Sequence, residues 1–413
     1  MNKSPRTLIR FSMLFYLVWL LLPAVQTTLR AASGGLCVVL FGIGALLDTE
    51  TLKKQWFSLF LRAAAAAVMP LVLMRFLGRG GTEPAGFYVQ NAMLWFPLVF
   101  AGHVRTVGDP ALWKNLHRVM WGAIVITLLT TIGWLFEGFT YGDIVYAYSR
   151  MLGNASEQPE LQKLYMQRNI GGYGFIYAMV VSLPLVCVSI RRHTGKKRLA
   201  LLALLGLQLL VIVLSQYTTA LLFTAVIMFL QLTACVLHHL SRKKLSFGQS
   251  LLCALGMVLG AMLFLEQLLV LTVRITHSLE MHSVYLNLQQ LIITLQGGAA
   301  ESTNRLAYYQ TAIEGIMRSP WMGSMLGGEK LLSMHSDLLD LLSGMGIICA
   351  CVVPALIWLM GRGSLRGLLK HHDRVQVVLS LIVYVAVAAM GTVVYSCDIM
   401  AVCMVSTLFV LEG

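Results

Sequence analysis

The strongest constraint on this chain is a series of long, nearly uninterrupted apolar runs, such as residues 199–214. A helix that crosses a bilayer needs about 20 predominantly apolar residues. Strands of a membrane β-barrel alternate apolar and polar residues instead, and these runs do not. Hydrophobic residues make up 58% of the chain and charged residues 12%, whereas a soluble domain carries about 25% charged residues. The sequence therefore predicts an all-α fold, a polytopic helical bundle in a membrane.

About 12 transmembrane helices are expected, in a single integral membrane domain over residues 1–413. The predicted spans are 8–28, 31–47, 56–77, 86–102, 115–137, 169–190, 199–215, 217–238, 248–270, 335–360, 375–392 and 394–411.

Basic residues are distributed unevenly between the two sides that these spans define. With the N-terminus in the cytoplasm, 20 of the 31 Lys and Arg residues lie in inner segments, 10 lie in outer segments, and Arg62 lies inside a span. Cytoplasmic loops of membrane proteins carry such an excess. We therefore expect both termini in the cytoplasm, and the net charge of +13 then reflects topology rather than a nucleic-acid site.

Two predicted outer segments are too long to be simple connections between helices. One covers residues 138–168, and the other covers residues 271–334, between the ninth and tenth spans. The inner segments are short, and none holds a GxxxxGK or GxGxxG phosphate-binding pattern. We expect the functional residues in the two external loops.

The longer external loop is predicted to contain a helix. Ser302 and Thr303 can cap a helix that starts near Asn304, and Pro320 should end it. Apolar residues at spacings of three and four make this helix amphipathic, lying on the membrane or on the bundle. Arg305 falls in its first turn, where it either forms an anion site with the free N–H groups or is a solvated surface residue. The apolar positions are Leu306, Tyr309, Ile313, Ile316 and Met317.

His335 opens the tenth predicted span, at the outer surface of the membrane. Asp337 and Asp340 follow it, and Arg305 precedes it on the same side. A neutral imidazole can accept a proton from a hydroxyl group near pH 7. The two interpretations are a general base at the membrane surface and a structural histidine.

The shorter external loop ends in Arg168 and Asn169, directly before the sixth predicted span. We expect Arg168 at the N-terminus of that helix. Two arginines at two helix N-termini on one face could hold a diphosphate, because guanidinium groups match phosphate oxygens. The alternative is that each arginine only anchors its segment at the membrane surface.

The residues after Arg305 resemble a known pattern. An amphipathic helix, Ser319-Pro320 and a glycine-containing turn are followed by His335 at the start of a leucine-rich helix. The remaining residues of the pattern are Gly323, Gly327, Ser336, Leu338, Leu339, Leu342, Gly344 and Gly346. This region, the helix count and the place of the long external loop are similar to those of the O-antigen ligase and O-antigen (polysaccharide) polymerase superfamily of bacterial membrane glycosyltransferases.

The resemblance implies an inverting, metal-independent transfer of a saccharide from undecaprenyl diphosphate to a hydroxyl of a glycan or a lipid core. By position, Arg168 and Arg305 would hold the diphosphate and His335 would be the general base. The residues expected to bind substrate are Asn169, Asn304, Gln216, Tyr217, Ser336 and Asp337. No cofactor is implied. The implied partners are the lipid-linked donor, a glycan acceptor, a flippase and a chain-length regulator at the bacterial cytoplasmic (inner) membrane.

One departure and several alternatives remain. Residues 215–219 lack the arginine that many members of the family carry there, so Gln216 and Tyr217 would have to replace it. A polymerase that joins repeat units is favoured over a ligase that joins finished chains. A transporter or flippase is an alternative of another class, with Arg62 and Glu266 as ionisable candidates within spans. A membrane acyltransferase would require the reverse topology.

Overall fold

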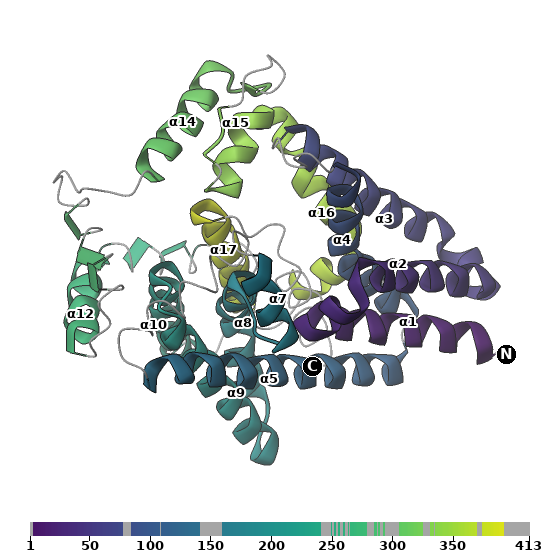
Figure 1. Ribbon diagram of the computed structural model, residues 1–413, viewed down its shortest axis with the longest axis horizontal. Helices are drawn as coiled ribbons and strands as arrows, with labels where there is room; N and C mark the ends of the chain where they lie inside the picture. Colours follow the sequence, from purple (N-terminus) through teal and green to yellow (C-terminus); the bar gives the residue numbers. More distant parts are fainter. Residues whose placement is uncertain are drawn as a thin grey trace.

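The computed structural model describes residues 3–76, 84–107, 109–140, 159–240, 265–278, 305–324, 331–333, 335–369 and 374–391, with a few further residues between 249 and 293. Every regular element in these ranges is helical, so the predicted all-α class is confirmed there (Figure 1). The helices are α1 (Lys3–Leu21), α2 (Pro23–Leu47), α3 (Thr49–Phe76), α4 (Pro84–Val107), α5 (Pro110–Thr140), α7 (Pro159–Gln167), α8 (Tyr173–Arg192), α9 (Gly195–Ser215), α10 (Thr218–Leu240), α12 (Leu265–Ser278), α14 (Arg305–Arg318), α15 (Asp337–Ala350), α16 (Val352–Leu369) and α17 (Arg374–Met390).

Several helices are long and apolar enough to cross a membrane. Four such segments are Gln55–Met74 in α3, Ala111–Phe136 in α5, and the whole of α8 and α9. The pair α15 and α16 would make a fifth if it is one bent span. These helices support a membrane protein, as expected. The predicted count of about 12 stays a prediction, because span 394–411 and part of span 248–270 lie outside the described residues.

Helix α8 forms the centre of the bundle. Its residues from Phe175 to Ile190 are buried on all sides, with Cys187 the partial exception. A helix that is apolar all round is suited to such a position, because no face of it prefers water. Helices α9, α10 and α17 pack against it, and Gln208 of α9 donates a hydrogen bond to Ser182 Oγ at 3.0 Å. The site described below lies around the start of α8.

The boundary between the first two helices differs from the prediction. The predicted spans were 8–28 and 31–47, but α1 ends at Leu21, and Pro23 starts α2. Leu22 between them has extended backbone angles. Proline lacks the N–H that a helix interior needs, and it is well accommodated in a first helical turn. The chain therefore breaks at Pro23, and α2 continues through the predicted gap.

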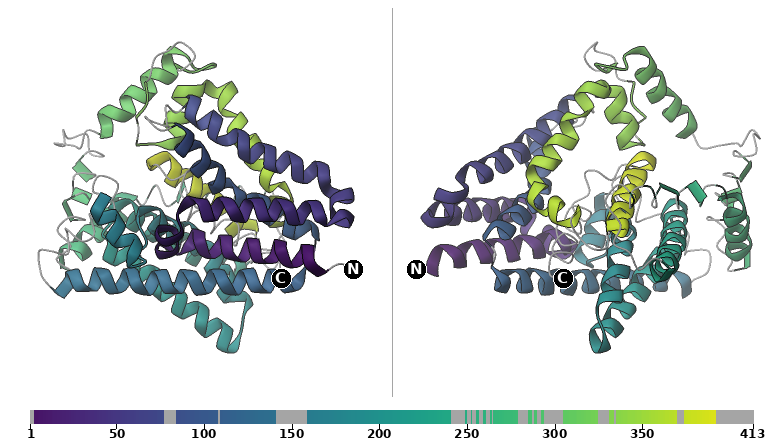
Figure 2. Two further views of the ribbon diagram at one scale, coloured as in Figure 1. Left: turned by 45° about the vertical axis from the view of Figure 1, so that its right-hand side comes forward. Right: turned by 180° about the vertical axis from the view of Figure 1, so that it is seen from behind.

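The predicted span 335–360 is wrong as a single helix. The segments Asp337–Ile348 and Val352–Met360 are bent by 102°, and α15 and α16 form an arch (Figure 2, right). Gly346 has a φ of 69°, a left-handed conformation that glycine adopts without steric cost. Near the bend the N–H groups of Ile347 and Ile348 donate to the carbonyls of Pro320 and Trp321, which lie outside this helix pair.

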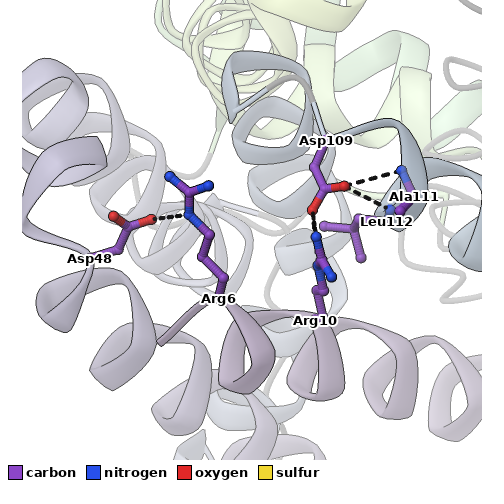
Figure 3. A network of polar contacts seen from close by, with 6 residues as sticks. All are labelled: Arg6, Arg10, Asp48, Asp109, Ala111 and Leu112. Carbon is purple, nitrogen blue, oxygen red and sulfur yellow. Dashed lines mark hydrogen bonds and ion pairs between the residues drawn. The ribbon is translucent and has the colours of Figure 1, made fainter. Parts of the chain in front are cut away.

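Two ion pairs join α1 to distant parts of the chain (Figure 3). Arg6 Nε lies 3.5 Å from Oδ2 of Asp48, which follows α2. Arg10 Nε donates to Oδ2 of Asp109, which precedes α5, at 2.9 Å, and a second nitrogen of Arg10 contacts the same oxygen. The pairs fix the first half of α1 against α2 and α5.

Asp109 also caps α5. Its Oδ1 accepts the N–H groups of Ala111 at 3.1 Å and Leu112 at 3.2 Å, which have no partner inside the helix. Burial by itself would raise the pKa of Asp109, but the hydrogen bonds from Arg10 and Leu112 and the charge of Arg10 hold that pKa below its ordinary value of 3.8. The carboxylate is therefore the form that the fold stabilises.

Candidate functional site

Arg168 lies at the end of α7, where the sequence predicted the start of a helix. The N–H of Asn169 donates to the carbonyl of Met166, and the N–H of Ile170 donates to that of Tyr165. With Asn169 at a φ of 57°, this is the Schellman pattern that closes a helix C-terminus. Helix α8 starts only at Tyr173. The expected anion site at a helix N-terminus is therefore wrong for Arg168, since a helix C-terminus favours cations such as its own guanidinium.

Asn169 joins three segments with its side chain. Its Oδ1 accepts the N–H of Ala24 at 3.3 Å in the first turn of α2, where Leu22 makes no side-chain cap. Its Nδ2 donates to Thr127 Oγ1 of α5 at 3.1 Å. Its backbone carbonyl accepts from Thr130 Oγ1 at 2.6 Å. The predicted substrate-binding side chain is thus buried and engaged inside the protein.

Arg168 lies against an aromatic surface. Its guanidinium carbon is 5.0 Å from the ring centroid of Trp134 in α5, a distance at which a cation is attracted by an aromatic face. The ring of Tyr165 in α7 is 5.4 Å from that of Trp134, edge to face. The guanidinium is exposed while both rings are buried. The charged guanidinium of Arg168 thus lies over the ring of Trp134 at the end of α7.

Tyr217 extends this aromatic surface to α9 and α10. It follows Gln216, whose φ of 53° ends α9. Its ring lies 5.4 Å from Tyr173 and 6.5 Å from Tyr177. The Tyr217 hydroxyl is buried, and a phenol can both donate and accept a hydrogen bond.

We call this group the tyrosine cluster. It consists of Trp134, Tyr165, Tyr173, Tyr177 and Tyr217, with Arg168 above Trp134. The predicted residues Arg168 and Tyr217 belong to one neighbourhood, although 49 positions separate them in the sequence. The structure joins them because the segment after α7 and the turn between α9 and α10 both lie at the start of α8.

The predicted helix in the longer external loop is confirmed as α14, over Arg305–Arg318. Its buried face holds small residues, Ala312 and Gly315, and packs against α15. A Cβ on Gly315 would lie 2.1 Å from Ser343 Oγ, so the two helices are in close contact there. The predicted apolar residues Ile313 and Met317 are exposed. These two side chains are therefore not packed on the bundle.

His335 lies beside α14. Its ring centroid is 4.9 Å from that of Tyr308, and the two rings are tilted by 47°. Tyr308 is three positions after Arg305, and residues three apart lie on one helix face. Imidazole, phenol and the first turn of α14 are thus neighbours. The sequence predicted only that His335 and Arg305 share one side of the membrane, and the structure adds that the imidazole lies against Tyr308 in the first turn of α14.

Hydrogen bonds hold the segment around His335. Oδ1 of Asp340 accepts both the N–H of Ser333 at 2.6 Å and its hydroxyl at 2.7 Å. The Ser333 oxygen in turn accepts the N–H groups of His335 at 3.1 Å and Ser336 at 3.0 Å. The backbone on both sides of His335 is therefore tied to the first turn of α15.

Other predicted substrate contacts have structural partners. Ser336 is fully buried, and its hydroxyl oxygen accepts the N–H of Leu339 at 3.1 Å as the N-cap of α15. Asp337 is also buried, and its N–H donates to the carbonyl of Gly391 after α17 at 3.1 Å. Neither side chain faces solvent in this structure. Asn304 lies outside the described residues.

The three predicted catalytic residues do not form one cluster. His335 and the start of α14 are together, whereas Arg168 lies at α7, which packs against α2. Helices α7 and α14 are apart in Figure 1, with α17 between them in that view. Helix α17 packs against α8, α10 and α15, so it connects the two sites. The expected clamp of Arg168 and Arg305 on one diphosphate is not formed in this arrangement.

Sequence reasoning missed several neighbours that the structure supplies. The sequence could have indicated two of them, because Tyr308 is three positions from Arg305 and Tyr165 is three positions from Arg168, so each pair would share a helix face. Trp134 and Ser333 have no such signal, because their partners are distant or lie in a loop. In the part of the chain that the structure describes, no three His, Cys, Asp or Glu side chains gather as they would around a metal ion.

No protein-family model and no curated protein sequence matches the chain. The functional assignment therefore depends on the site itself and on the resemblance in the residue pattern.

Proposed function

We propose that this chain is a membrane glycosyltransferase that moves a saccharide from a lipid diphosphate to a hydroxyl group of a glycan. The observation that carries the proposal is the placement of His335. It lies two residues before α15, and its ring is beside Tyr308, which is one helical turn after Arg305 in α14. An imidazole next to a cationic helix start is what a transfer between a hydroxyl and a diphosphate requires.

The proposed step is a single displacement. The His335 imidazole takes the proton of the acceptor hydroxyl, whose oxygen forms a bond to the anomeric carbon. The bond from that carbon to the diphosphate oxygen breaks, and the lipid diphosphate leaves with the electron pair. Arg305 balances the charge that develops on the diphosphate, and the imidazolium then releases its proton to water. Attack opposite the leaving group inverts the anomeric configuration.

The partly exposed rings of the tyrosine cluster, Tyr173 and Tyr217, are proposed to bind the saccharide. Aromatic rings offer an apolar face, while the hydroxyls of Tyr173 and Tyr217 offer polar edges. Sugar rings present the same combination of apolar C–H faces and hydroxyl groups. Arg168, exposed over Trp134, can contact an acidic sugar or a phosphate at this place. Its role is then separate from that of Arg305.

The proposal places the reaction at the external face of the bacterial cytoplasmic membrane, with both termini in the cytoplasm. The distribution of basic residues supports this orientation. The donor is a saccharide on undecaprenyl diphosphate, and a flippase would deliver it. We favour a surface-polysaccharide polymerase that works with a chain-length regulator, and an O-antigen or surface polymer ligase is the alternative within the same chemistry.

Complementation with matched variants tests the proposal. A strain without this gene receives wild type, His335→Ala or Arg305→Ala at equal expression, and its surface and lipid-linked glycans are compared. Loss of a general base lowers turnover by about 10²–10⁴-fold. Both variants should therefore accumulate lipid-linked single repeat units. Accumulation of long lipid-linked chains would identify a ligase instead.

Two control variants come from the same external segment. His277 pairs with Tyr285 at 5.1 Å between ring centroids, much as His335 pairs with Tyr308. Arg318 ends the helix that Arg305 begins. His277→Ala and Arg318→Ala should leave the glycan pattern unchanged. An unchanged pattern in His335→Ala as well would refute the proposed catalytic role.

Transport of a lipid-linked saccharide is the second candidate function. Arg62 is buried inside the apolar segment Gln55–Met74, against Gly102 of α4, and the bent pair α15 and α16 is a broken helix. Intramembrane charges and broken helices occur at transport sites. In proteoliposomes, a transporter would move the lipid-linked saccharide without changing its mass, whereas the proposed transferase changes it. Arg62→Gln would abolish that movement, and His335→Ala would not.

A further inference from the structure

Asp340 is linked to His335, the proposed base, through hydrogen bonds to Ser333. Its side chain is only 2% exposed, and its Oδ1 accepts two hydrogen bonds from Ser333, at 2.6 and 2.7 Å. Bonds to an ionised carboxylate are shorter and roughly twice as strong as bonds between neutral groups. The bond lengths are those of a charge-assisted pair.

Ser333 passes this restraint to His335. Its hydroxyl has one proton, which it donates to Asp340, so its oxygen is free to accept. That oxygen accepts the N–H groups of His335 and Ser336. The position of one hydroxyl therefore sets the backbone on both sides of the imidazole, and Asp340 sets the position of the hydroxyl.

The surface that receives His335 is itself rigid. Gly315 of α14 is in close contact with Ser343 of α15, and the Ser343 hydroxyl donates to the carbonyl of Leu331. With α14 and α15 fixed to each other, the orientation of the segment 333–336 decides how the ring meets Tyr308.

We propose that Asp340 and Ser333 are positioning residues that hold the His335 imidazole in place beside Tyr308. This inference rests on the proposed function for its catalytic consequence, but the geometry itself can be tested without activity. Asp340 has no contact with substrate in this account. It acts only through Ser333. Its buried carboxyl group is stabilised by the two short hydrogen bonds from Ser333 and by its position in the first turn of α15.

Three variants separate the contributions of shape and charge. Ser333→Ala removes the hydroxyl, Asp340→Ala removes the acceptor, and Asp340→Asn keeps an acceptor oxygen of the same shape. Ser324→Ala is the matched control. It removes the hydrogen bond from the buried Ser324 hydroxyl to the carbonyl of Ser343 in α15, but no bond to the segment 333–336. The purified full-length chain is used throughout.

The first measurement is turnover of a lipid-linked oligosaccharide in proteoliposomes. A misplacement of about 1 Å can cost about 10²-fold in rate, so Ser333→Ala and Asp340→Ala should lower kcat by about that factor with KM nearly unchanged. Asp340→Asn should restore most of the kcat, and Ser324→Ala should retain it. An Asp340→Asn variant as impaired as Asp340→Ala would overturn the positioning role.

The second measurement does not depend on activity. Diethyl pyrocarbonate modifies accessible histidines, and mass spectrometry gives the modification rates of His335 and His277 in one sample. Ser333→Ala and Asp340→Ala should increase the rate at His335 several-fold and leave His277 unchanged. Equal rates at His335 in wild type and Ser333→Ala would sink the inference. If His335→Ala keeps full turnover while these rates shift as expected, only the proposed function fails.

Discussion

Asn169 shows how one residue can be singled out correctly by sequence and yet serve another purpose. Its position beside Arg168 suggested contact with a substrate. In the structure its amide caps α2, binds Thr127 of α5, and sits in the left-handed turn that closes α7. The cap joins segments about 145 positions apart. A single polar side chain thus organises the base on which Arg168 and the tyrosine cluster rest.

Two substitutions at Asn169 should rank in an unusual order. Asn169→Gly loses both side-chain bonds and should cost about 1–3 kcal/mol, but glycine tolerates the φ of 57°. Asn169→Ala loses the same bonds and adds about 1–2 kcal/mol of left-handed strain. Thermal unfolding in detergent should therefore give wild type above Asn169→Gly above Asn169→Ala. Alanine at or above glycine would contradict the assigned turn.

At the scale of elements, the bend between α15 and α16 is the feature with the largest consequence. The bend places Ile347 and Ile348 on the carbonyls of Pro320 and Trp321. The loop after α14 and the bend thus fix each other, and this closure holds His335 against Tyr308.

Gly346 should not tolerate a side chain. A Cβ there would lie 2.4 Å from backbone atoms of Trp321, and the φ of 69° is itself unfavourable for alanine. Gly346→Ala should cost about 2–4 kcal/mol from strain and overpacking together. In the middle of α9, Gly206 has no atom near its missing Cβ, so Gly206→Ala should gain roughly 0.5–1 kcal/mol. Unfolding midpoints of both variants against wild type measure the difference.

At the scale of the whole molecule, the central position of α8 and the connecting role of α17 decide which surfaces can cooperate. Helix α17 packs on α8, α10 and α15, and the residue that follows it accepts the N–H of Asp337. The tyrosine cluster and His335 are therefore at neighbouring ends of connected helices.

The orientation of the molecule can be measured directly. In a cysteine-free background, a single cysteine at Thr194, between α8 and α9, should react with an impermeant maleimide only after the inner face is made accessible. A cysteine at the exposed position Met322 should react in intact cells. The reverse result would contradict the proposed external site and would favour the cytoplasmic acyl-transfer alternative.

The predictions about the site in the two external loops have three different outcomes. The helix near Asn304 is confirmed, because capping residues, Pro320 and apolar spacing are local signals. The placement of Arg168 at a helix N-terminus is wrong, since the short helix α7 before it carries no strong signal. The loop limits 138–168 and 271–334 and the roles of Arg168, Arg305 and His335 stay predictions.

The sequence by itself determined that the chain is helical and suited to a membrane, because apolar runs of sufficient length leave backbone groups no other partner in lipid. It also located α14 and His335, whose signals lie within a few residues. Only the tertiary structure decided where α1 and α2 separate, where α15 bends, and which side chains meet Arg168 and Ser333. Those outcomes depend on contacts such as Asn169 to Ala24 and Gly346 to Trp321, which join segments far apart in the chain and leave no periodic pattern along it.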